Sequence, residues 1–323
     1  MKIKGFDFLL TFKCPAKCAH CTYRAGPERE GKMTVSQGVK YLEILKEYHP
    51  VEWFTIHGGE PCLYFNDLIK LISKARKLQI ARIGIITNSF WAENLELAKK
   101  KIQKLKDAGL THITFSVDAF HQKFIHLKSV KNAIQSTLEV GFDRLNVDTY
   151  YINSITTPNE HNLMNEEYLR EITKFEEVEI SRYSADLEGR AADTIIKDIE
   201  KTSTVPSGKC KLPFWIGGDL KNPTTIEIDH SGNVTLCPGI CIGNAEKECL
   251  NIILDNYDYS KHPIISVLEA KGPIGLLELA KTKNYDEEKK SFFNECHLCY
   301  EIRRFLQPHY PEFLAPKGCY SSY

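Results

Sequence analysis

The sequence has no excess of charge of either sign. Its 323 residues include 42 Lys and Arg and 42 Asp and Glu, so the formal net charge is zero. A protein that holds nucleic acid or an anionic membrane over a broad surface needs an excess of basic side chains. Nucleic acid is therefore a disfavoured partner, although a zero net charge still allows local basic patches.

Long apolar runs are also absent. No stretch approaches the roughly 20 apolar residues that a membrane-spanning helix needs. The apolar run 6–12 is interrupted by Asp7 and lacks the small-residue cleavage site of a signal peptide. We therefore expect a cytoplasmic protein with no membrane partner. The chain has no repeats, and its 42% hydrophobic and 26% charged residues fit a globular protein with a sizeable core.

Cysteine, by contrast, is abundant, with 11 residues. Disulfides rarely persist in a reducing compartment, and an odd number of cysteines cannot all pair within one chain. Buried thiols account for some of them, but not for groups at metal-ligand spacing.

Residues 1–185 alternate β-rich segments with helical stripes. This alternation implies parallel strands joined by right-handed crossovers. A complete eight-unit barrel typically needs about 250 residues, so the alternatives are a partial barrel and a doubly wound sheet. The expected strands are 6–12, 51–57, 80–87, 111–117, 144–152 and 178–183, and the expected helices are 34–48, 65–78, 95–108, 130–140 and 165–175.

In either architecture the ligand site forms from the loops at the carboxyl ends of the strands. Four groups of chemically informative residues follow the first four strands in turn. They are Cys14, the segment Gly58-Gly59-Glu60-Pro61, Asn88 and Asp118. We expect these residues to lie at one edge of the sheet.

Cys14, Cys18 and Cys21 bring three thiols within eight residues, at C-x3-C-x2-C spacing. Thiolates suit iron–sulfur clusters or zinc. A structural zinc site usually has four ligands, and no fourth lies nearby unless His20 or a distant cysteine supplies it. A four-iron cluster on three cysteines would leave one iron open to a small molecule, which is a catalytic arrangement.

This trio after the first strand, with Gly-Gly-Glu-Pro after the second, resembles the radical S-adenosylmethionine (SAM) superfamily. The resemblance covers roughly residues 5–192. It implies that the trio binds a [4Fe-4S] cluster whose open iron is chelated by SAM. One electron, from a donor such as flavodoxin or ferredoxin, would then split SAM into a 5′-deoxyadenosyl radical that abstracts a hydrogen atom from substrate.

The resemblance also implies a set of cofactor-binding residues. The glycine segment would bind the methionine ammonium through its backbone, with Glu60 adding charge, because glycine lets a ligand approach the main chain closely. His20 stands where the family often has an aromatic residue, and Ser89 replaces a frequent glycine. An aspartate that merely caps a strand end is the alternative for Asp118. The full set is Gly58, Gly59, Glu60, Pro61, Asn88, Ser116, Asp118, His20 and Arg190.

A second group of cysteines lies in the C-terminal part. Cys296 and Cys299 form a C-x2-C pair, a strong metal signal, and Cys237 follows an expected hairpin at 224–236. This resembles the SPASM/twitch extensions of radical SAM enzymes. It implies one auxiliary, fully ligated cluster, with a structural zinc as the alternative. The predicted ligands are Cys210, Cys237, Cys296 and Cys299, with Cys241 or Cys319 as alternatives to Cys210.

We therefore predict an α/β fold, with a partial (β/α)6 barrel over residues 1–192 and a linker plus small α+β iron–sulfur extension over 193–323. The resemblance to peptide maturases implies a peptide or protein side chain as substrate. Cys241 is the nearest substitute for the hydrogen-atom donor of radical SAM peptide epimerases, because Pro238 occupies the donor's position. The alternatives are a small molecule such as a sugar or nucleoside, and a non-catalytic, zinc-stabilised binding protein.

Overall fold

The computed structural model describes residues 1–199, 205–210, 217–286 and 291–321. These residues form two compact units. The barrel unit comprises Lys4–Cys18 and Ala25–Ala185, and the C-terminal unit comprises Met1–Ile3, Ala19–Arg24 and Asp186–Tyr323. By its internal contacts, the main part of the C-terminal unit begins at Asp186, and two N-terminal segments also belong to it. The predicted domain boundary at residue 192 stays a prediction. The predicted linker, which falls at residues 203–223 of the range 193–323, lies partly outside the described residues.

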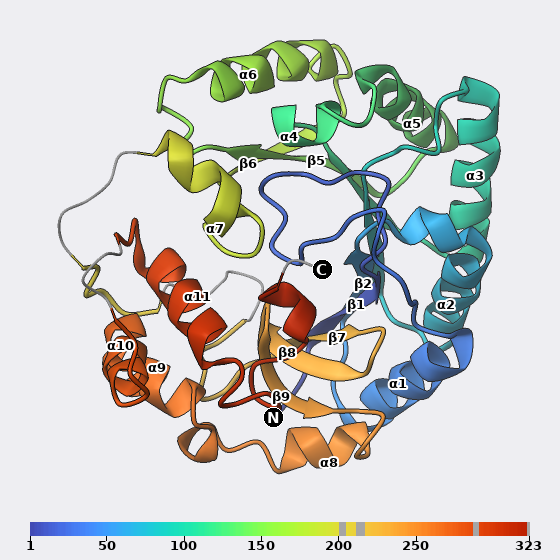
Figure 1. Ribbon diagram of the computed structural model, residues 1–323. Helices are drawn as coiled ribbons and strands as arrows, with labels where there is room; N and C mark the ends of the chain where they lie inside the picture. The colour runs from blue at the N-terminus through green and yellow to red at the C-terminus, as the bar shows by residue number, and fades with distance from the viewer. Residues whose placement is uncertain (200–204, 211–216, 287–290, 322–323) are drawn as a thin grey trace. The chain divides into compact units, whose positions relative to one another are not determined.

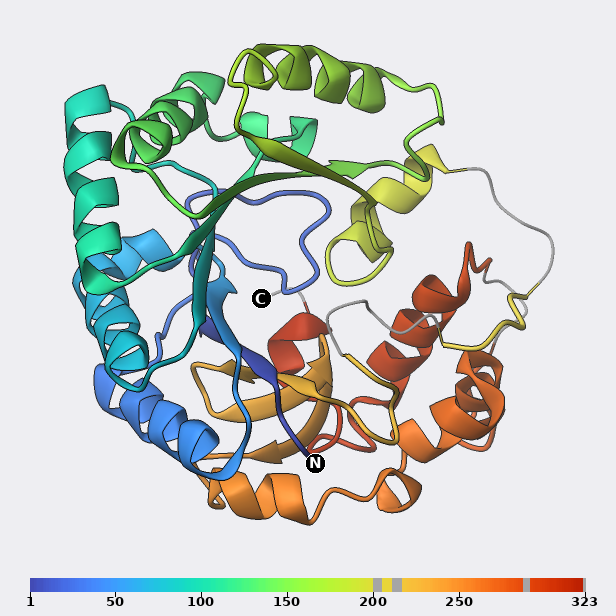
Figure 2. The same ribbon diagram turned by 180° about the vertical axis from the view of Figure 1, so that it is seen from behind.

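The barrel unit is built on six parallel strands in the order β6-β5-β4-β3-β2-β1. Their helices line one face of the sheet (Figures 1 and 2), which excludes the doubly wound alternative. Among the described residues β6 pairs only with β5, so the sheet does not close. The strands are β1 (Gly5–Thr11), β2 (Trp53–Gly58), β3 (Arg82–Thr87), β4 (His112–Ser116), β5 (Arg144–Tyr151) and β6 (Glu179–Ser184), and the helices are α1 (Val35–Tyr48), α2 (Phe65–Lys77), α3 (Leu95–Ala108), α4 (Ala119–Gln122), α5 (Leu127–Val140) and α6 (Glu160–Ile172).

The prediction of a partial (β/α)6 barrel is confirmed, and most boundaries fall within a few residues of those expected. The predicted start of the helix at residue 165 is wrong. Asn159 caps α6, its side chain accepting from the amide of Asn162, so the helix begins at Glu160. The short helix α4 was not expected; it begins where Asp118 accepts from the amides of Phe120 and His121.

The two faces of the sheet differ in chemistry. In β5 buried Leu145 and Val147 alternate with half-buried Asn146 and Asp148, as expected for a strand with one face in the core. The polar set continues across the sheet, because Ser116 pairs in register with Asp148, which itself pairs with Ser181 on β6. On β4, β5 and β6 the face opposite the helices is therefore polar rather than a second core.

The C-terminal unit contains an antiparallel sheet in the order β7-β8-β9. The predicted hairpin is confirmed: the Asp229 carboxylate accepts from the amides of Ser231 and Asn233 at the turn between β7 and β8. A break at Gly272-Pro273 separates α9 from α10. The elements are β7 (Thr225–Asp229), β8 (Asn233–Cys237), β9 (Ile240–Asn244), α7 (Ala191–Thr194), α8 (Leu250–Asp255), α9 (Ile265–Lys271), α10 (Pro273–Lys281) and α11 (Glu295–Leu306).

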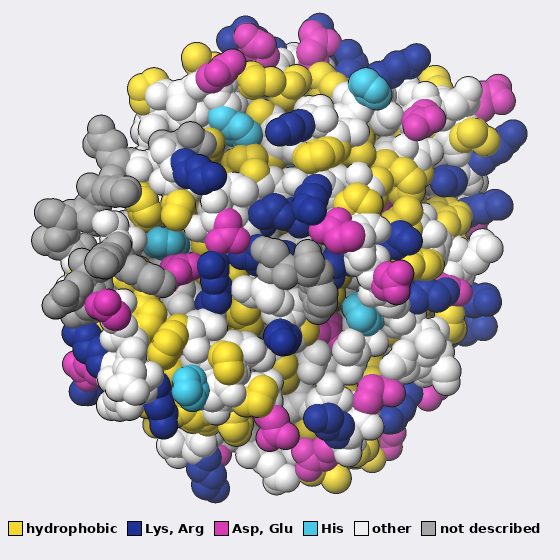
Figure 3. Space-filling model, in the orientation of Figure 1, with side chains coloured by type: hydrophobic (Ala, Val, Ile, Leu, Met, Phe, Trp, Pro, Cys, Tyr) yellow, Lys and Arg dark blue, Asp and Glu magenta, His cyan; other side chains and the backbone are white. Residues whose placement is uncertain are grey.

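Basic and acidic side chains are interspersed over the face drawn in Figure 3, in keeping with the zero net charge. Within the described ranges, no helix combines the length and apolar character needed to cross a membrane.

Candidate functional site

Cys14 and Cys18 lie in a loop that leaves the carboxyl end of β1. The base of this loop is closed by Gly26, which accepts from the Cys14 amide at 3.0 Å and donates to the carbonyl of Phe12 at 3.1 Å. Cys14 and Cys18 are 7% and 5% exposed, and Cys21 is half-buried. The loop is therefore held at its root, with two of its three thiols largely shielded from water.

Gly58 and Gly59, at the end of β2, pack backbone to backbone against the residues that lead into Cys14. The Gly59 amide donates to the Thr11 carbonyl at 2.6 Å. A Cβ on Gly59 would lie 2.2 Å from the Lys13 carbonyl oxygen, and Gly58 has φ +121°. Glycine is required at both positions by a neighbouring strand end, independently of any ligand. Their binding of a methionine ammonium stays a prediction.

Glu60 joins the ends of β2 and β3. One carboxylate oxygen accepts from the Cys62 amide at 2.9 Å and the Thr87 hydroxyl at 2.8 Å, and the other accepts from the Asn88 amide at 2.8 Å. Burial raises the pKa of Glu60, and these hydrogen bonds oppose the rise. The carboxylate is fully buried, so in this structure it organises the strand ends.

Asn88 lies directly against the predicted cluster loop. Its side-chain amide donates to the Cys14 sulfur at 3.4 Å, while its side-chain oxygen accepts from the amide of Phe90. An N–H aimed at a sulfur stabilises a thiolate. The structure thus brings Asn88 and Cys14 together, two residues that the sequence predicted separately.

Buried Asp118 and half-buried His121 form a pair after β4. Nδ1 of His121 lies 2.9 Å from both carboxylate oxygens of Asp118. Burial lowers the pKa of His121, but the charges of Asp118 and Cys18 outweigh it and hold that pKa well above its usual value. Sequence reasoning missed His121; its signal was the i,i+3 spacing from an aspartate at a strand end. Ser116 ends β4, largely buried.

Asp148 sits near this pair, on the polar face of β5. Burial raises the pKa of Asp148 to about 6, a hydrogen bond from Asn146 opposes the rise, and Asp118 adds to it. Because the folded pKa is raised, the ionised form is penalised, and stability falls as pH rises from about 4 through about 6.

Asp148→Asn removes this penalty while keeping the shape of the side chain. We expect the variant to exceed the wild type in free energy of unfolding by about 1–3 kcal/mol at pH 7. The advantage should disappear near pH 4, where both side chains are neutral. Urea unfolding of the two apoproteins across this pH range measures the effect, and an advantage of equal size at pH 4 would contradict it.

The segment that carries Cys21 belongs to the C-terminal unit. The Arg190 amide donates to the Cys21 carbonyl at 3.0 Å, and the Thr194 hydroxyl donates to the Ala19 carbonyl at 2.9 Å. Gly189 has φ +59°, and a Cβ there would lie 2.2 Å from the Thr22 carbonyl oxygen. The Gly189-Arg190 motif therefore contacts the cluster loop through its main chain.

Two side chains fix the same segment further. Tyr23 donates to the buried carboxylate of Glu227 on β7, and the Arg24 guanidinium binds Asp193 and donates to the Tyr300 hydroxyl at 3.1 Å. Residues Ala19–Arg24 are thus anchored by β7, by the segment near α7 and by α11.

The sequence of the barrel unit also shows to which family the chain belongs. The profile of the radical SAM superfamily matches residues 8–172, about half of the chain. The chain belongs to the radical SAM superfamily.

The names of related proteins refer to different kinds of molecule. A probable GTP 3′,8-cyclase of Methanococcus maripaludis is 34% identical over 155 residues, covering 46% of this chain and 49% of that protein. The putative peptide biosynthesis protein YydG of Bacillus subtilis is 25% identical over 139 residues, covering 41% of each chain. The match thus spans about half the length, or less, of these curated relatives.

A solved structure of polyhistidine-tagged anSMEcpe with bound AdoMet resembles a larger part of this radical SAM protein. The likeness covers 97% of this chain and 98% of that chain, with a TM-score of 0.52 and 13% identity. At this identity the likeness concerns the fold alone.

Membership of the radical SAM superfamily implies a [4Fe-4S] cluster and SAM, and the donor set fits. Cys14 and Cys18 are thiols shielded from water. The Asn88 side-chain amide donates to Cys14, and the His121 side chain interacts with Cys18. Thiolates with hydrogen-bond donors beside them are suitable iron ligands.

The four cysteines predicted to hold an auxiliary centre are brought together in the C-terminal unit. Cys237 and Cys296 are each within electrostatic reach of Cys210 and Cys299. The choice between an iron–sulfur cluster and a zinc ion at these thiols stays a prediction.

Cys241 is buried in β9, where its thiol donates to the Gly243 carbonyl at 3.1 Å. Burial raises the pKa of Cys241 to about 11. This local hydrogen bond favours Cys210 over Cys241 as the fourth auxiliary ligand. A hydrogen-donor role for Cys241 stays a prediction, as does stacking of His20 on adenine.

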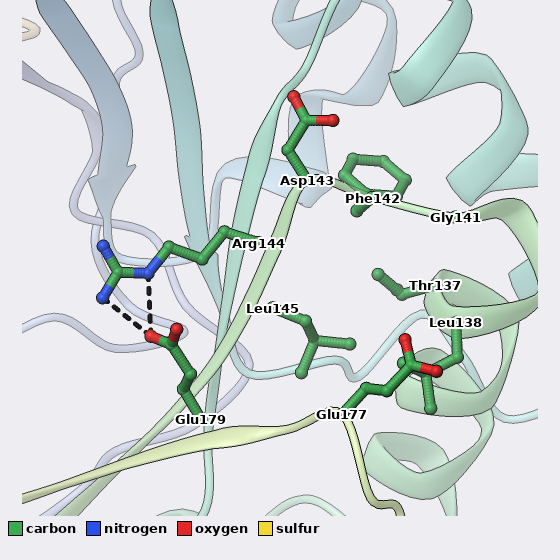
Figure 4. Close-up of a pocket in the computed structure, with 9 residues that line it drawn as sticks. All are labelled: Thr137, Leu138, Gly141, Phe142, Asp143, Arg144, Leu145, Glu177 and Glu179. Atoms are coloured by element: carbon green, nitrogen blue, oxygen red, sulfur yellow. Dashed lines mark hydrogen bonds and ion pairs between the residues drawn. The ribbon is translucent and has the colours of Figure 1, made fainter.

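A pocket of about 120 Å³ in the barrel unit lies away from all these residues. Figure 4 shows it beside Arg144 and Glu179, the first residues of β5 and β6, which form an ion pair of 2.7 Å. It is therefore at the amino ends of the strands, whereas the candidate site is at their carboxyl ends.

Proposed function

We propose that this radical SAM protein reductively cleaves SAM and removes a hydrogen atom from a peptide or protein side chain. The observation that carries the proposal is that β6 has no strand on its other side in the described part of the chain, since an open side admits a substrate too large for a closed barrel. The similarity to YydG, named as a peptide biosynthesis protein, supports the same substrate class.

The cluster and SAM, when bound, would supply a 5′-deoxyadenosyl radical. The chain's own residues have simpler tasks in the proposal. Cys14, Cys18 and Cys21 hold the cluster, and Asn88 fixes Cys14 by its hydrogen bond. Ser116, with the backbone of Gly58–Pro61, faces SAM. Arg190 supports the Cys21 segment through its main-chain amide.

The proposal includes an auxiliary [4Fe-4S] cluster on Cys210, Cys237, Cys296 and Cys299. With four thiolate ligands it has no open iron, so its role is to relay electrons or to fasten the C-terminal unit. A cytoplasmic location and a flavodoxin or ferredoxin as electron donor belong to the same proposal, because both clusters need a reducing compartment.

A small polar molecule is the second candidate substrate. The similarity to a GTP 3′,8-cyclase favours it, and so does the polar face of the sheet that carries Ser116, Asn146 and Asp148. Hydroxyl, amide and carboxylate groups gathered on one face suit a ligand rich in hydrogen-bonding groups.

The test is anaerobic reconstitution followed by incubation with SAM and dithionite. We expect 5′-deoxyadenosine from the wild type, and at least about a hundredfold less from Cys14→Ala, since an incomplete ligand set removes the chemistry that the cofactor supplies. A colourless protein that contains zinc and never cleaves SAM would refute the catalytic function and support a binding protein.

Substrate class is tested separately, with deuterated candidates. Peptides encoded beside the gene form one arm, and GTP forms the other. Deuterium appearing in 5′-deoxyadenosine from a peptide supports the first candidate, and deuterium from GTP alone supports the second.

A further inference from the structure

Arg303 is a buried cation on the helix that carries two of the proposed auxiliary ligands. It follows Cys299 by one helical turn and Cys296 by two, so the three side chains share one face of α11. Its side chain is 1% exposed. A buried guanidinium is costly unless charge and hydrogen bonds compensate it, so its surroundings need an explanation.

The guanidinium is fixed by groups next to the cluster ligands. Nη1 donates to the carbonyl of Pro238, the residue after Cys237, at 2.7 Å. Nη1 also donates to the Tyr320 hydroxyl at 3.1 Å, and Nη2 to the Glu188 carboxylate at 3.0 Å. Tyr320 in turn donates to the Gly239 carbonyl at 2.7 Å. Arg303 therefore holds the turn that follows Cys237 against the helix of Cys299.

One N–H donor of this guanidinium lacks a hydrogen-bond acceptor among the described residues. This donor is the buried Nε of Arg303. Leaving a buried charged donor unpaired is destabilising, because it loses its hydrogen bonds to water without replacement. An anion beside Nε would satisfy it, and the Cys299 thiol lies within hydrogen-bonding reach of the guanidinium.

The charge beside these ligands comes from one buried ion pair. Glu188 is 5% exposed and accepts from Nη2 of Arg303 at 3.0 Å, and the guanidinium lies on the helix that carries Cys296 and Cys299. A cluster with four thiolate ligands is a net anion, so it needs such a cation when it is buried.

We propose that Arg303 is the positioning residue of the auxiliary centre, directing its Nε–H and its charge at the cluster and thereby raising the cluster's reduction potential. The inference rests on the proposed auxiliary cluster. Reduction adds negative charge to the cluster, and a nearby cation stabilises the reduced form. Net charge and hydrogen bonds to the sulfurs are established determinants of such potentials.

The experiment uses the full chain with Cys14, Cys18 and Cys21 changed to Ala, so that only the auxiliary cluster contributes a signal. Arg303→Met, Arg303→Lys and Arg304→Met are made in this background. Arg304 is the matched control, a neighbouring arginine that binds Asp193 and Glu301 instead. Iron content and a redox titration followed by electron paramagnetic resonance are the readouts, and neither depends on activity.

We expect R303M to lower the potential at unchanged iron content, R303K to retain most of the wild-type value, and R304M to leave it unchanged. An unchanged potential in R303M overturns the proposal. If the background protein holds no iron, the auxiliary cluster itself is refuted and the role of Arg303 falls with it. That outcome leaves SAM cleavage by the wild type unaffected, so the two failures are distinguishable.

R303M leaves Glu188 without its partner and could lose the cluster for that reason alone. The double variant E188Q/R303M removes both charges and keeps the site neutral. A lowered potential in this variant supports the proposal. Iron lost from both R303M and E188Q/R303M but kept by R303K also supports it, because a cation is then what retains the centre. Iron lost from R303K as well indicates a purely structural role and overturns it.

Discussion

Replacing Glu60 with alanine is expected to lower the free energy of unfolding by about 3 kcal/mol. The change removes the shared acceptor of the Cys62 amide, the Thr87 hydroxyl and the Asn88 amide, all of them buried. Native domains have a free energy of unfolding of only about 5–15 kcal/mol, so the loss would be a large fraction of the total. Because Asn88 also contacts Cys14, the cluster loop should loosen with it.

Urea unfolding followed by tryptophan fluorescence measures this effect. Trp91 is a local probe, since its indole N–H donates to the Thr87 hydroxyl at 3.0 Å. Glu60→Gln keeps the shape but turns an N–H₂ toward a donor, so we expect a smaller loss of about 1–3 kcal/mol. Glu43→Gln is the matched control: Glu43 pairs with Lys74 at the surface, and such pairs contribute about 0–1 kcal/mol.

The outcome separates two roles for the Gly-Gly-Glu-Pro motif. If Glu60→Ala unfolds at the wild-type urea concentration, the carboxylate is dispensable to the fold, and the sequence-based expectation that Glu60 adds charge for SAM becomes the better account. If Glu60→Ala lowers the free energy of unfolding as expected, the glutamate of the motif serves to join the ends of β2 and β3. Its contribution to SAM is then made by the main chain.

The order of elements in the barrel unit could be predicted from sequence because each strand and helix carries its own apolar period. The face of β5 that packs against the helices is visible in the alternation of Leu145 and Val147 with polar neighbours. Helix starts were harder, since they depend on one side chain. Both Asn159 and Asn165 are possible caps by residue type, and only the folded backbone shows which one accepts from an amide at the start of α6.

The residues of the candidate site also differ in whether the sequence could predict them. The cysteines could be found from sequence because their spacing along the chain is itself the signal for a metal. The partners of those cysteines could not, because they come from other strands and helices. Nothing in the local sequence connects Asn88 with Cys14 or His121 with Cys18, and both pairs depend on the register of β1, β3 and β4. The role of Arg303 could not be predicted for a different reason: a single arginine in an amphipathic helix is usually a surface residue.

The division of the cluster loop between two units has a functional consequence. Cys14 and Cys18 belong to the barrel unit and Cys21 to the C-terminal unit. A motif of eight residues therefore depends on contacts made by residues more than 150 positions away in the sequence, such as Arg190 and Glu227. The C-terminal unit thus holds Cys21 of the predicted catalytic trio as well as the proposed auxiliary ligands.

Gly189→Ala tests this dependence directly, and we expect it to abolish the catalytic cluster. A Cβ at residue 189 would lie 2.2 Å from the Thr22 carbonyl oxygen and 2.6 Å from that of Cys21. Both are main-chain atoms that cannot rotate away, and φ of +59° adds strain for any residue with a side chain. The segment must move, and Cys21 moves with it.

The measurement is iron and sulfide content in a background where Cys296 and Cys299 are Ala, which leaves only the catalytic cluster. We expect about four irons per chain before the change and close to none after it, because a [4Fe-4S] cluster needs its cysteine ligands in place. Gly141→Ala is the matched control. Gly141 also has a positive φ, of +76°, but its added Cβ meets only the end of the Lys106 side chain, at 3.7 Å. The control therefore carries similar backbone strain without the clash, and should keep its iron. Full iron content and wild-type SAM cleavage in Gly189→Ala would mean that Cys21 is positioned by the barrel unit alone, and that the contacts of Gly189 and Arg190 with the loop are incidental to the cluster.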